Sequence, residues 1–376
     1  MKETMGLYVH IPFCQKKCHY CDFLTFARQE GMMEKYVDYL IKEMALYAKE
    51  DYLLDSIYFG GGTPSYLAAE EMDRIMQAIY AYFDVSEDCE ISIEMNPESV
   101  TAERLEVYLK HGFNRYTMGV QSFDDAVLTL MGRLHDGQTV RDRVDLLRKM
   151  GVKNLGIDLM FANPKQNMAI LKSDLKQGLS LNPDHISYYS LMIKEGTPFA
   201  RWVQTRQIQL IEDEAEREMY HYIQSELAKA GYQQYEISNF ARPGAESRHN
   251  LKYWTLANYI GLGLGAHSNI DLVRYSNCRQ FDHYFTKIDQ GQKPIAYQEQ
   301  LSLEDREKEY IMLNLRLIKG FAIAELNQKF NINFEEKYRT AIDKHLKLGT
   351  VSLKDGQFTF TKFGLDVGNQ FYLDIL

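Results

Sequence analysis

Three cysteines within eight residues constrain this chain more than any other feature of its sequence. They lie in the segment Cys14-Gln15-Lys16-Lys17-Cys18-His19-Tyr20-Cys21, after a short apolar run at 7–11 that predicts a strand. Thiolates this close together repel one another unless a metal holds them. A closed zinc site needs four ligands, and no second C-x-x-C or H-x-x-x-H follows. Cysteines at i, i+4 and i+7 can each bind one iron of a [4Fe-4S] cube and leave the fourth iron without a protein ligand. The alternative to such a cluster is a structural zinc knuckle or an oxidisable pair of cysteines.

Charge and cysteine usage narrow the class of protein. The formal net charge of −9 argues against general affinity for nucleic acid, which requires clustered Lys and Arg. The two other cysteines, Cys89 and Cys278, are far apart, as is typical of a reducing compartment. We see no signal-peptide core and no apolar run of the roughly 20 residues that a membrane span needs. We therefore expect a cytoplasmic protein without a transmembrane segment, and peripheral membrane contact stays open.

Apolar runs and helical periodicity alternate through the first half of the chain. The expected strands lie at 7–11, 56–59, 91–95, 116–120, 155–160 and 185–191, each followed by a helical pattern. Six strand-helix units in series predict an α/β fold with a parallel sheet and helices outside it. Six is fewer than the eight of a full TIM barrel, so we expect an open, partial (β/α)6 barrel.

Polar residues stand where several of these strands end, which is where functional residues of such barrels lie. The run Gly60–Pro64 follows the second strand, and its glycines would let backbone approach a ligand and expose N–H donors, or would simply form a tight turn. Glu94, Gln121 and Asp158 are polar among apolar neighbours and need partners, which ribose hydroxyls or nearby protein groups could supply. Arg133 could balance a carboxylate of the protein or of a ligand, or be a surface cation.

A second motif follows a segment at 211–230 with a helical pattern and an expected strand at 232–240. It reads His249-Asn250-Leu251-Lys252-Tyr253-Trp254. A neutral imidazole is a common ligand of haem iron, and Tyr253 and Trp254 offer flat apolar contacts. The alternative is a structural histidine packed among aromatic side chains.

The last 76 residues predict a separate module. Helical patterns at 305–317, 322–330 and 335–348 precede two alternating runs joined by Asp355-Gly356, a hairpin signal. This order is typical of a winged-helix-like α+β module. Eleven Lys and Arg face eleven Asp and Glu from residue 300 onward, so the charge pattern of a DNA reader is missing and we expect a lid or docking role. The expected domains are the barrel, a connecting segment with the histidine motif and the C-terminal module, at 1–240, 241–299 and 300–376.

The cysteine spacing with Tyr20 before the third cysteine resembles the radical S-adenosylmethionine (SAM) superfamily. The order of motifs is similar to the branch that contains oxygen-independent coproporphyrinogen III oxidases and haem chaperones. The resemblance implies a [4Fe-4S] cluster on Cys14, Cys18 and Cys21 whose open iron binds SAM. The residues that match the SAM-contacting set of this branch are Tyr8, Tyr20, Gly61, Gly62, Thr63, Glu94, Gln121, Arg133 and Asp158. The sequence departs from the branch at Phe161–Pro164, where relatives usually show a G-L-P turn.

Two features separate the activities within this branch. Its oxidases carry a further cysteine two positions after the third, where this chain has Phe23, and they lack the His249 motif. The resemblance therefore implies a protein that binds haem through His249, Tyr253 and Trp254 and delivers it to haem-requiring proteins, respiratory membrane enzymes among them. The alternative is oxidative decarboxylation of coproporphyrinogen III. No catalytic residue is assigned, and whether SAM is cleaved and whether a homodimer forms stay open.

Overall fold

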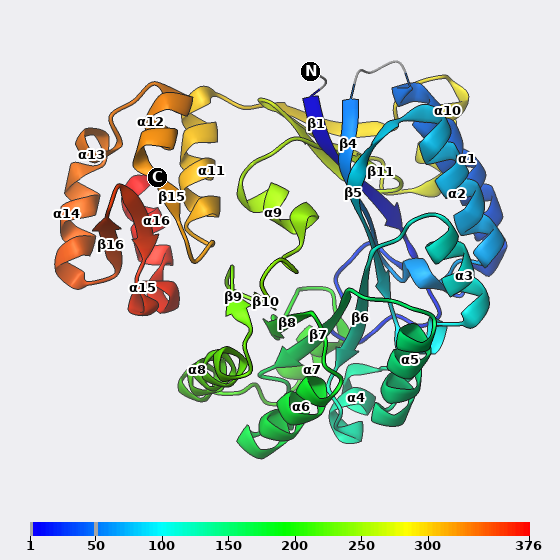
Figure 1. Cartoon of the computed structure of the whole chain (residues 1–376), viewed down its shortest axis with the longest axis horizontal. Helices are drawn as coiled ribbons and strands as arrows, with labels where there is room; N and C mark the ends of the chain where they lie inside the picture. The colour runs from blue at the N-terminus through cyan, green and yellow to red at the C-terminus, as the bar shows by residue number, and fades with distance from the viewer. Residues whose placement is uncertain (1–2, 49–51) are drawn as a thin grey trace.

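The computed structural model describes residues 3–48 and 52–376, and a twelve-stranded sheet forms its centre (Figure 1). Six neighbouring strands of this sheet run parallel. They are β1 (Glu3–Ile11), β4 (Tyr52–Gly61), β5 (Asp84–Met95), β6 (Arg115–Gln121), β7 (Leu155–Phe161) and β8 (His185–Ser190). The predicted six-unit partial barrel is confirmed.

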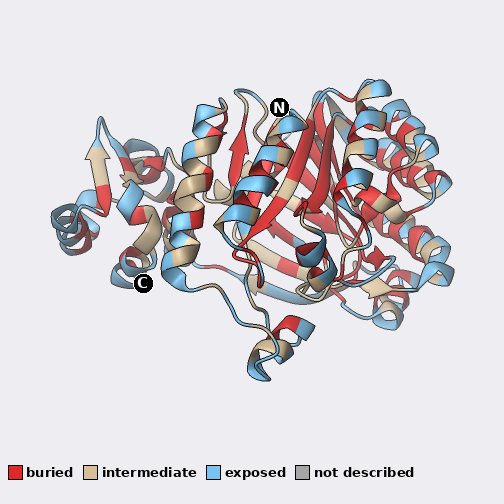
Figure 2. Ribbon diagram, turned by 90° about the horizontal axis from the view of Figure 1, so that it is seen from below, coloured by how far each residue is buried: buried red, intermediate tan, exposed pale blue. Residues whose placement is uncertain are grey.

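Helices cover the outer face of the sheet, and the strands between them are largely buried (Figure 2). Each helix turns an apolar stripe inward, as in the helix after β1, where Tyr36, Leu40 and Met44 are fully buried. These helices are α1 (Met33–Tyr47), α2 (Ala69–Tyr82), α3 (Ala102–Lys110), α4 (Asp125–Met131), α5 (Gly137–Lys149), α6 (Met168–Ser180) and α8 (Asp213–Lys229). The short helix α7 (Pro198–Gln204) instead packs on the cysteine loop.

The sheet extends beyond the predicted barrel on both edges. Next to β1 lies β11 (Tyr259–Leu262), parallel to it, followed by three antiparallel strands. These are β12 (His267–Ile270), β13 (Val273–Asn277) and β14 (Ile295–Gln300). At the other edge, the single strand expected at 232–240 is two short ones, β9 (Gln233–Gln234) and β10 (Asn239–Ala241). The sheet thus continues into 241–299, which we had expected to be a connecting segment.

One helix lies on the concave side of the sheet, α9 (Arg248–Trp254), and it carries the histidine motif (Figure 1). His249 is hydrogen-bonded to Ser56, and Lys252 forms an ion pair with Asp55 at 2.8 Å. Both partners stand early in β4, so α9 closes the barrel near the N-terminal ends of the strands, opposite the end where the cysteine loop lies.

The C-terminal module has its own small core and its own sheet, in the order β15-β17-β16. Its helices are α11 (Leu303–Asn314), α12 (Ile323–Phe330), α13 (Phe334–Lys337), α14 (Arg339–Leu348), α15 (Lys362–Val367) and α16 (Asn369–Ile375). Its strands are β15 (Phe321–Ala322), β16 (Val351–Lys354) and β17 (Gln357–Phe360). Asp355 and Gly356 have φ of 52° and 75°, as the predicted two-residue hairpin requires. Within 3–48 and 52–376, no helix has the length and apolarity to cross a bilayer.

A buried carboxylate on α1 anchors the extra strands to the barrel. Glu43 is fully buried and accepts hydrogen bonds from the Gly263 amide at 2.8 Å, Asn277 Nδ2 at 2.7 Å and the Tyr284 hydroxyl at 2.5 Å. Tyr284 stands on α10 (Phe281–Asp289). The Glu43 side chain therefore connects α1 to α10 and to the turn between β11 and β12. Burial raises the pKa of this carboxyl to about 7.

We expect Glu43→Ala to lower the free energy of unfolding by about 2–4 kcal/mol, because three buried donors lose their acceptor at once. Urea denaturation followed by circular dichroism measures this loss. The matched control is Glu34→Ala, an exposed position on the same helix, which should leave the transition nearly unchanged. Equal stability of both variants would contradict the anchoring role.

Candidate functional site

A cavity of about 400 Å³ opens at the C-terminal ends of the parallel strands. Side chains from the cysteine loop and from all the strand ends between β4 and β8 line it. Eleven of the residues singled out from the sequence are among them: Cys14, Cys18, Tyr20, Cys21, Gly61, Gly62, Thr63, Glu94, Gln121, Arg133 and Asp158. The structure thus brings the first motif and the strand-end residues into one place.

The cysteine loop starts in β2 (Phe13–Cys14) and surrounds one side of the cavity. Thr63 Oγ1 donates to Cys14 Sγ at 3.5 Å, and Arg133 Nη1 donates to Cys18 Sγ at 3.6 Å. Burial raises the pKa of the Cys14 thiol to about 11 and also raises that of Cys21. Metal binding by this loop therefore has to release protons from the thiols.

The described residues hold no group of three His, Cys, Asp or Glu side chains placed to share a single metal ion. A four-iron cube does not need such a group, because each cysteine binds a different iron. The spread of the three thiols around the cavity is therefore compatible with a cluster.

The glycine run joins β4 to the cysteine loop by backbone contacts. The Gly62 amide donates to the Ile11 carbonyl and the Thr63 amide donates to the Phe13 carbonyl, both at 2.8 Å. A Cβ on Gly62 would lie 2.7 Å from the Phe13 oxygen, so only glycine fits there. The expectation that this run exposes free N–H donors is wrong for these two amides, since the end of β1 and the start of the cysteine loop already accept them.

Two carboxylates lie among the cavity walls. Glu94, near the end of β5, accepts a hydrogen bond from the Tyr58 hydroxyl at 2.7 Å, and burial raises its pKa to about 7. Asp158 stands in the middle of β7, and burial raises its pKa to about 6 although Ser187 hydrogen-bonds to it. The pKa values of both side chains thus lie close to neutral pH, and both side chains can accept hydrogen bonds from ligand hydroxyls.

Backbone strain concentrates at the same rim of strand ends. Gln121, the last residue of β6, has a φ of 67°, a conformation that non-glycine residues seldom adopt. Ala162 has a φ of 57° in the segment where relatives show G-L-P, so this chain makes a left-handed turn without glycine. The side chain of Asn163 supports the turn, because its Nδ2 donates to the Met160 carbonyl at 3.0 Å.

Asn96 is a cavity residue that the sequence reasoning did not single out. Its Nδ2 donates to Thr63 Oγ1 at 2.9 Å, and its Oδ1 accepts from Arg133 Nη2 at 2.7 Å. Asn96 thereby positions two predicted residues. Its place directly after β5, between Met95 and Pro97, was the available signal.

Arg133 reaches the cavity from the segment after α4. Besides Asn96 and Cys18, it donates to the Gly119 carbonyl at 2.5 Å. Its Nε is buried and has no hydrogen-bond partner among the described residues.

Tyr8 is the one predicted SAM contact that does not line the cavity. Its hydroxyl is hydrogen-bonded to His10 Nδ1 at 2.9 Å, and its ring stacks on Tyr58 at 6.3 Å. Tyr8 therefore lies behind Tyr58, which in turn holds Glu94.

His249 is fully buried in the structure. Its Nδ1 is hydrogen-bonded to Ser56 Oγ at 3.0 Å, its Nε2 to the Tyr253 hydroxyl at 2.9 Å, and its ring stacks on Tyr58 at 5.1 Å. Burial lowers its pKa to about 3, so the imidazole is neutral. This is the packed arrangement weighed above as the alternative to iron ligation.

The other two predicted haem contacts point to different neighbours. Tyr253 packs edge-on against Tyr259 at 4.8 Å, whereas Trp254 lies under the Arg316 guanidinium at 4.9 Å. The three residues share one helix but face no common cavity among those described. Their role in haem binding stays a prediction.

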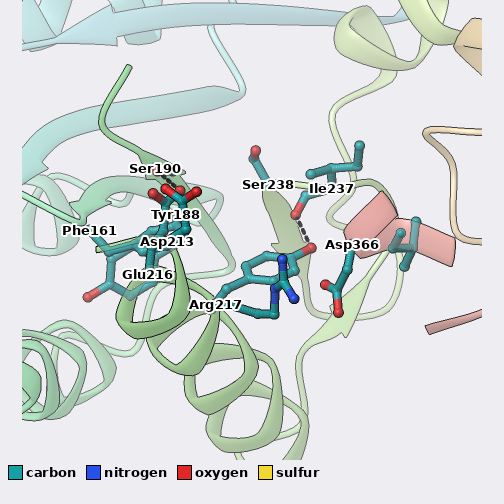
Figure 3. A pocket seen from close by; sticks show the side chains of 11 residues that line it. Phe161, Tyr188, Ser190, Asp213, Glu216, Arg217, Ile237, Ser238 and Asp366 are labelled. Atoms are coloured by element: carbon teal, nitrogen blue, oxygen red, sulfur yellow. Dashed lines mark hydrogen bonds between the residues drawn. The ribbon is translucent and has the colours of Figure 1, made fainter. Parts of the chain in front are cut away.

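A second cavity of about 340 Å³ lies between the barrel and the C-terminal module (Figure 3). Phe161 and Ser190 line it from strand ends, Glu216 from α8 and Asp366 from α15. Ser190 donates to Glu216 at 2.5 Å and lines both cavities, while Asp366 pairs with His221 at 3.1 Å. This cavity marks one of the contacts between the module and the barrel, and Ser190 places it next to the first cavity.

Comparisons with known proteins agree with this architecture. Residues 8–177 match the Radical SAM superfamily, and residues 301–367 match the HemN C-terminal domain. The heme chaperone HemW of Lactococcus lactis is 35% identical over 99% of this chain and 97% of its own length. That of Bacillus subtilis is 33% identical over 97% of each chain. The structure of coproporphyrinogen III oxidase (HemN) from Escherichia coli superposes with a TM-score of 0.88 at 23% identity, covering 100% of this chain and 90% of that one, which shows a shared fold. The chain therefore belongs to the HemW family of the radical SAM superfamily.

Proposed function

We propose that this protein is a haem chaperone, which binds haem and passes it to haem-requiring proteins, respiratory membrane enzymes among them. The observation that carries this proposal is the similarity to heme chaperones HemW along nearly the whole chain, barrel and C-terminal module together. The similarity to the oxidase HemN, at 23% identity, supports the fold alone.

Cys14, Cys18 and Cys21 would hold a [4Fe-4S] cluster in this protein. The donor set fits, because three thiols around one cavity match a cube with one iron free and no fourth cysteine lines the cavity. When bound, such a cluster supplies an open iron for the amino and carboxylate groups of SAM and can donate an electron to its sulfonium. The chain's own contribution is to fix the loop through Thr63 and Arg133.

The walls of the cavity suit SAM as the second ligand. Glu94, Asp158 and Gln121 offer acceptors for ribose hydroxyls, and Arg133 in the cavity wall supplies a positive charge for a carboxylate. Burial and the neighbouring Asp158 both raise the pKa of Glu94, so a cationic sulfonium ligand would be favourable beside Glu94, whereas Arg115 and Arg133 already act on Asp158. Tyr20, Gly61, Gly62 and Thr63 complete the predicted set, and Tyr8 would act through Tyr58.

Phe23 favours transfer of haem over chemistry on a porphyrinogen. It occupies the position where the oxidases of the resembling branch carry a further cysteine, and it is 64% exposed. His249, Tyr253 and Trp254 remain predicted haem contacts, and their use would require α9 to leave its packed position. The proposed division into 1–240, 241–299 and 300–376 assigns the cluster and SAM to the barrel, the haem-binding motif to the middle segment and a lid or docking role to the C-terminal module.

The first test concerns the cluster. Anaerobic reconstitution of the wild type should load about four irons per chain with the broad visible absorbance of an iron–sulfur cluster. Each of Cys14→Ser, Cys18→Ser and Cys21→Ser should lose most of that iron. Cys89→Ser and Cys278→Ser, at buried positions away from the loop, are the controls and should load normally. Stoichiometric zinc without this absorbance would overturn the cluster.

The second test uses the raised pKa of Glu94. If SAM, with its net positive charge, prefers the ionised carboxylate, a pKa of about 7 predicts affinity that rises roughly tenfold from pH 6 to pH 8. Equilibrium dialysis with labelled SAM on reconstituted protein measures this rise. Glu94→Gln should flatten most of it, leaving the smaller contribution of Asp158, whereas Glu87→Gln, exposed on the same strand, should keep it. A pH profile unchanged in Glu94→Gln would remove Glu94 from the SAM site.

The third test separates chaperone from oxidase. Haem added to the wild type should produce a saturable change in the Soret band, and the loaded protein should pass haem to an apo-form of a haem-requiring acceptor. Reconstituted protein with SAM, reductant and coproporphyrinogen III should release no carbon dioxide at enzyme-like rates. Steady decarboxylation would replace the chaperone proposal with the oxidase.

A further inference from the structure

The mouth of the first cavity carries large apolar side chains that face solvent. Phe23 and Met192 line the cavity yet are 64% and 65% exposed, and Tyr189 beside them is 38% exposed. Phe23 lies two residues after Cys21, and Met192 lies two residues after the end of β8. Exposed apolar side chains gathered at the mouth of a pocket mark a ligand contact more often than a structural one.

These residues come from opposite ends of the parallel barrel. Phe23 belongs to the loop after the first strand, and Met192 to the segment after the sixth. The two segments meet over the cavity, since the Phe199 amide donates to the His19 carbonyl at 3.0 Å and the Tyr20 ring packs 6.3 Å from Phe199. The mouth is therefore a defined part of the fold, held by contacts from both sides.

The mouth of the cavity carries positively charged side chains, although the chain as a whole has a negative net charge. Lys16, Lys17 and Lys194 are exposed and line the cavity there, and Asp22 is the exposed carboxylate that lines it with them; Glu195, next to Lys194, is exposed but does not line the cavity. Lys17 Nζ donates to the Phe23 carbonyl at 3.2 Å, which places one ammonium next to the apolar surface. An excess of lysines over carboxylates at this mouth, in a chain of net charge −9, favours a ligand with carboxylates.

His249, the haem contact predicted from the sequence, is not accessible to a ligand in this structure. Both ring nitrogens of His249 are hydrogen-bonded inside the barrel, and the side chain has no exposed surface. A flat ring reaching His249 would have to displace Tyr58 or Tyr253, whereas the mouth needs no rearrangement.

We infer that haem docks at the mouth of the cavity, with its ring against Phe23 and Met192 and its propionates paired with Lys16, Lys17 and Lys194. This inference rests on the proposed haem-binding function and names the site for it. Recognition is of the apolar ring and the carboxylates, so it does not depend on the iron. The inner walls at Glu94 and Asp158 stay free for the second ligand.

The experiment measures the dissociation constants of haem and of metal-free protoporphyrin for the reconstituted full chain, by quenching of intrinsic fluorescence. Lys16→Glu with Lys17→Glu and Lys194→Glu should weaken both ligands roughly tenfold or more. Its control reverses three exposed lysines away from the cavity, Lys149, Lys153 and Lys176, with the same change in net charge and less than about a twofold effect. The double variant Phe23→Ser/Met192→Ser should weaken the binding of both ligands equally at low and at high salt. It should still bind SAM, which shows that the variant is folded.

The variant His249→Gln tests the competing site for haem, on α9. If haem docks at the mouth, this variant should lose no more affinity for haem than for metal-free protoporphyrin, because the mouth supplies no ligand to the iron. Unchanged haem affinity in both mouth variants, together with its loss in His249→Gln, would overturn the inference and assign haem to α9 while the chaperone function stands. Failure of the wild type to bind haem at all would instead refute the function on which the inference rests.

Discussion

The short loop with three cysteines keeps its shape because two distant parts of the barrel hold it by their backbones. On one side the Gly62 and Thr63 amides just after β4 donate to the carbonyls of Ile11 and Phe13, where the loop begins, and on the other the Phe199 amide in α7 donates to the carbonyl of His19. Backbone contacts this close leave no space for a Cβ at Gly62. The positions of the thiols and of the mouth depend on this clamp, since both are built on segments that it joins.

The inner cavity stores unfavourable electrostatics that a ligand would relieve. Glu94 and Asp158 are carboxylates whose surroundings in the cavity wall desolvate them, which is why the pKa of each lies above its ordinary value. Gln121 adds local backbone strain at the same level of the barrel. A stable domain retains such features only where surrounding packing compensates for them, and the fully buried apolar residues of the six central strands supply that packing.

The six parallel strands could be predicted because each is a short apolar run followed by a helical period. β11–β14 could not, since their side chains alternate irregularly and the glycines at 261–265 look like a loop. The cavity residues were found through motifs at strand ends, where parallel topology forces them together. Met192 and Lys194 were missed because nothing in the sequence shows that the segment after β8 turns back over the cysteine loop. The burial of His249 depends on where α9 packs, which its own seven residues do not determine.

Tyr58 links the two motifs that looked independent in the sequence. Its ring stacks on His249, and its hydroxyl donates to Glu94 in the cavity wall. Freeing His249 would break its bonds to Ser56 and Tyr253 inside the barrel, and each buried group left unpaired costs about 1–3 kcal/mol. It would also remove the support of Tyr58 and loosen Glu94. The packing of α9 therefore helps to fix the shape of the cavity. A ligand at the mouth needs this shape, and so needs His249 to stay in its buried position.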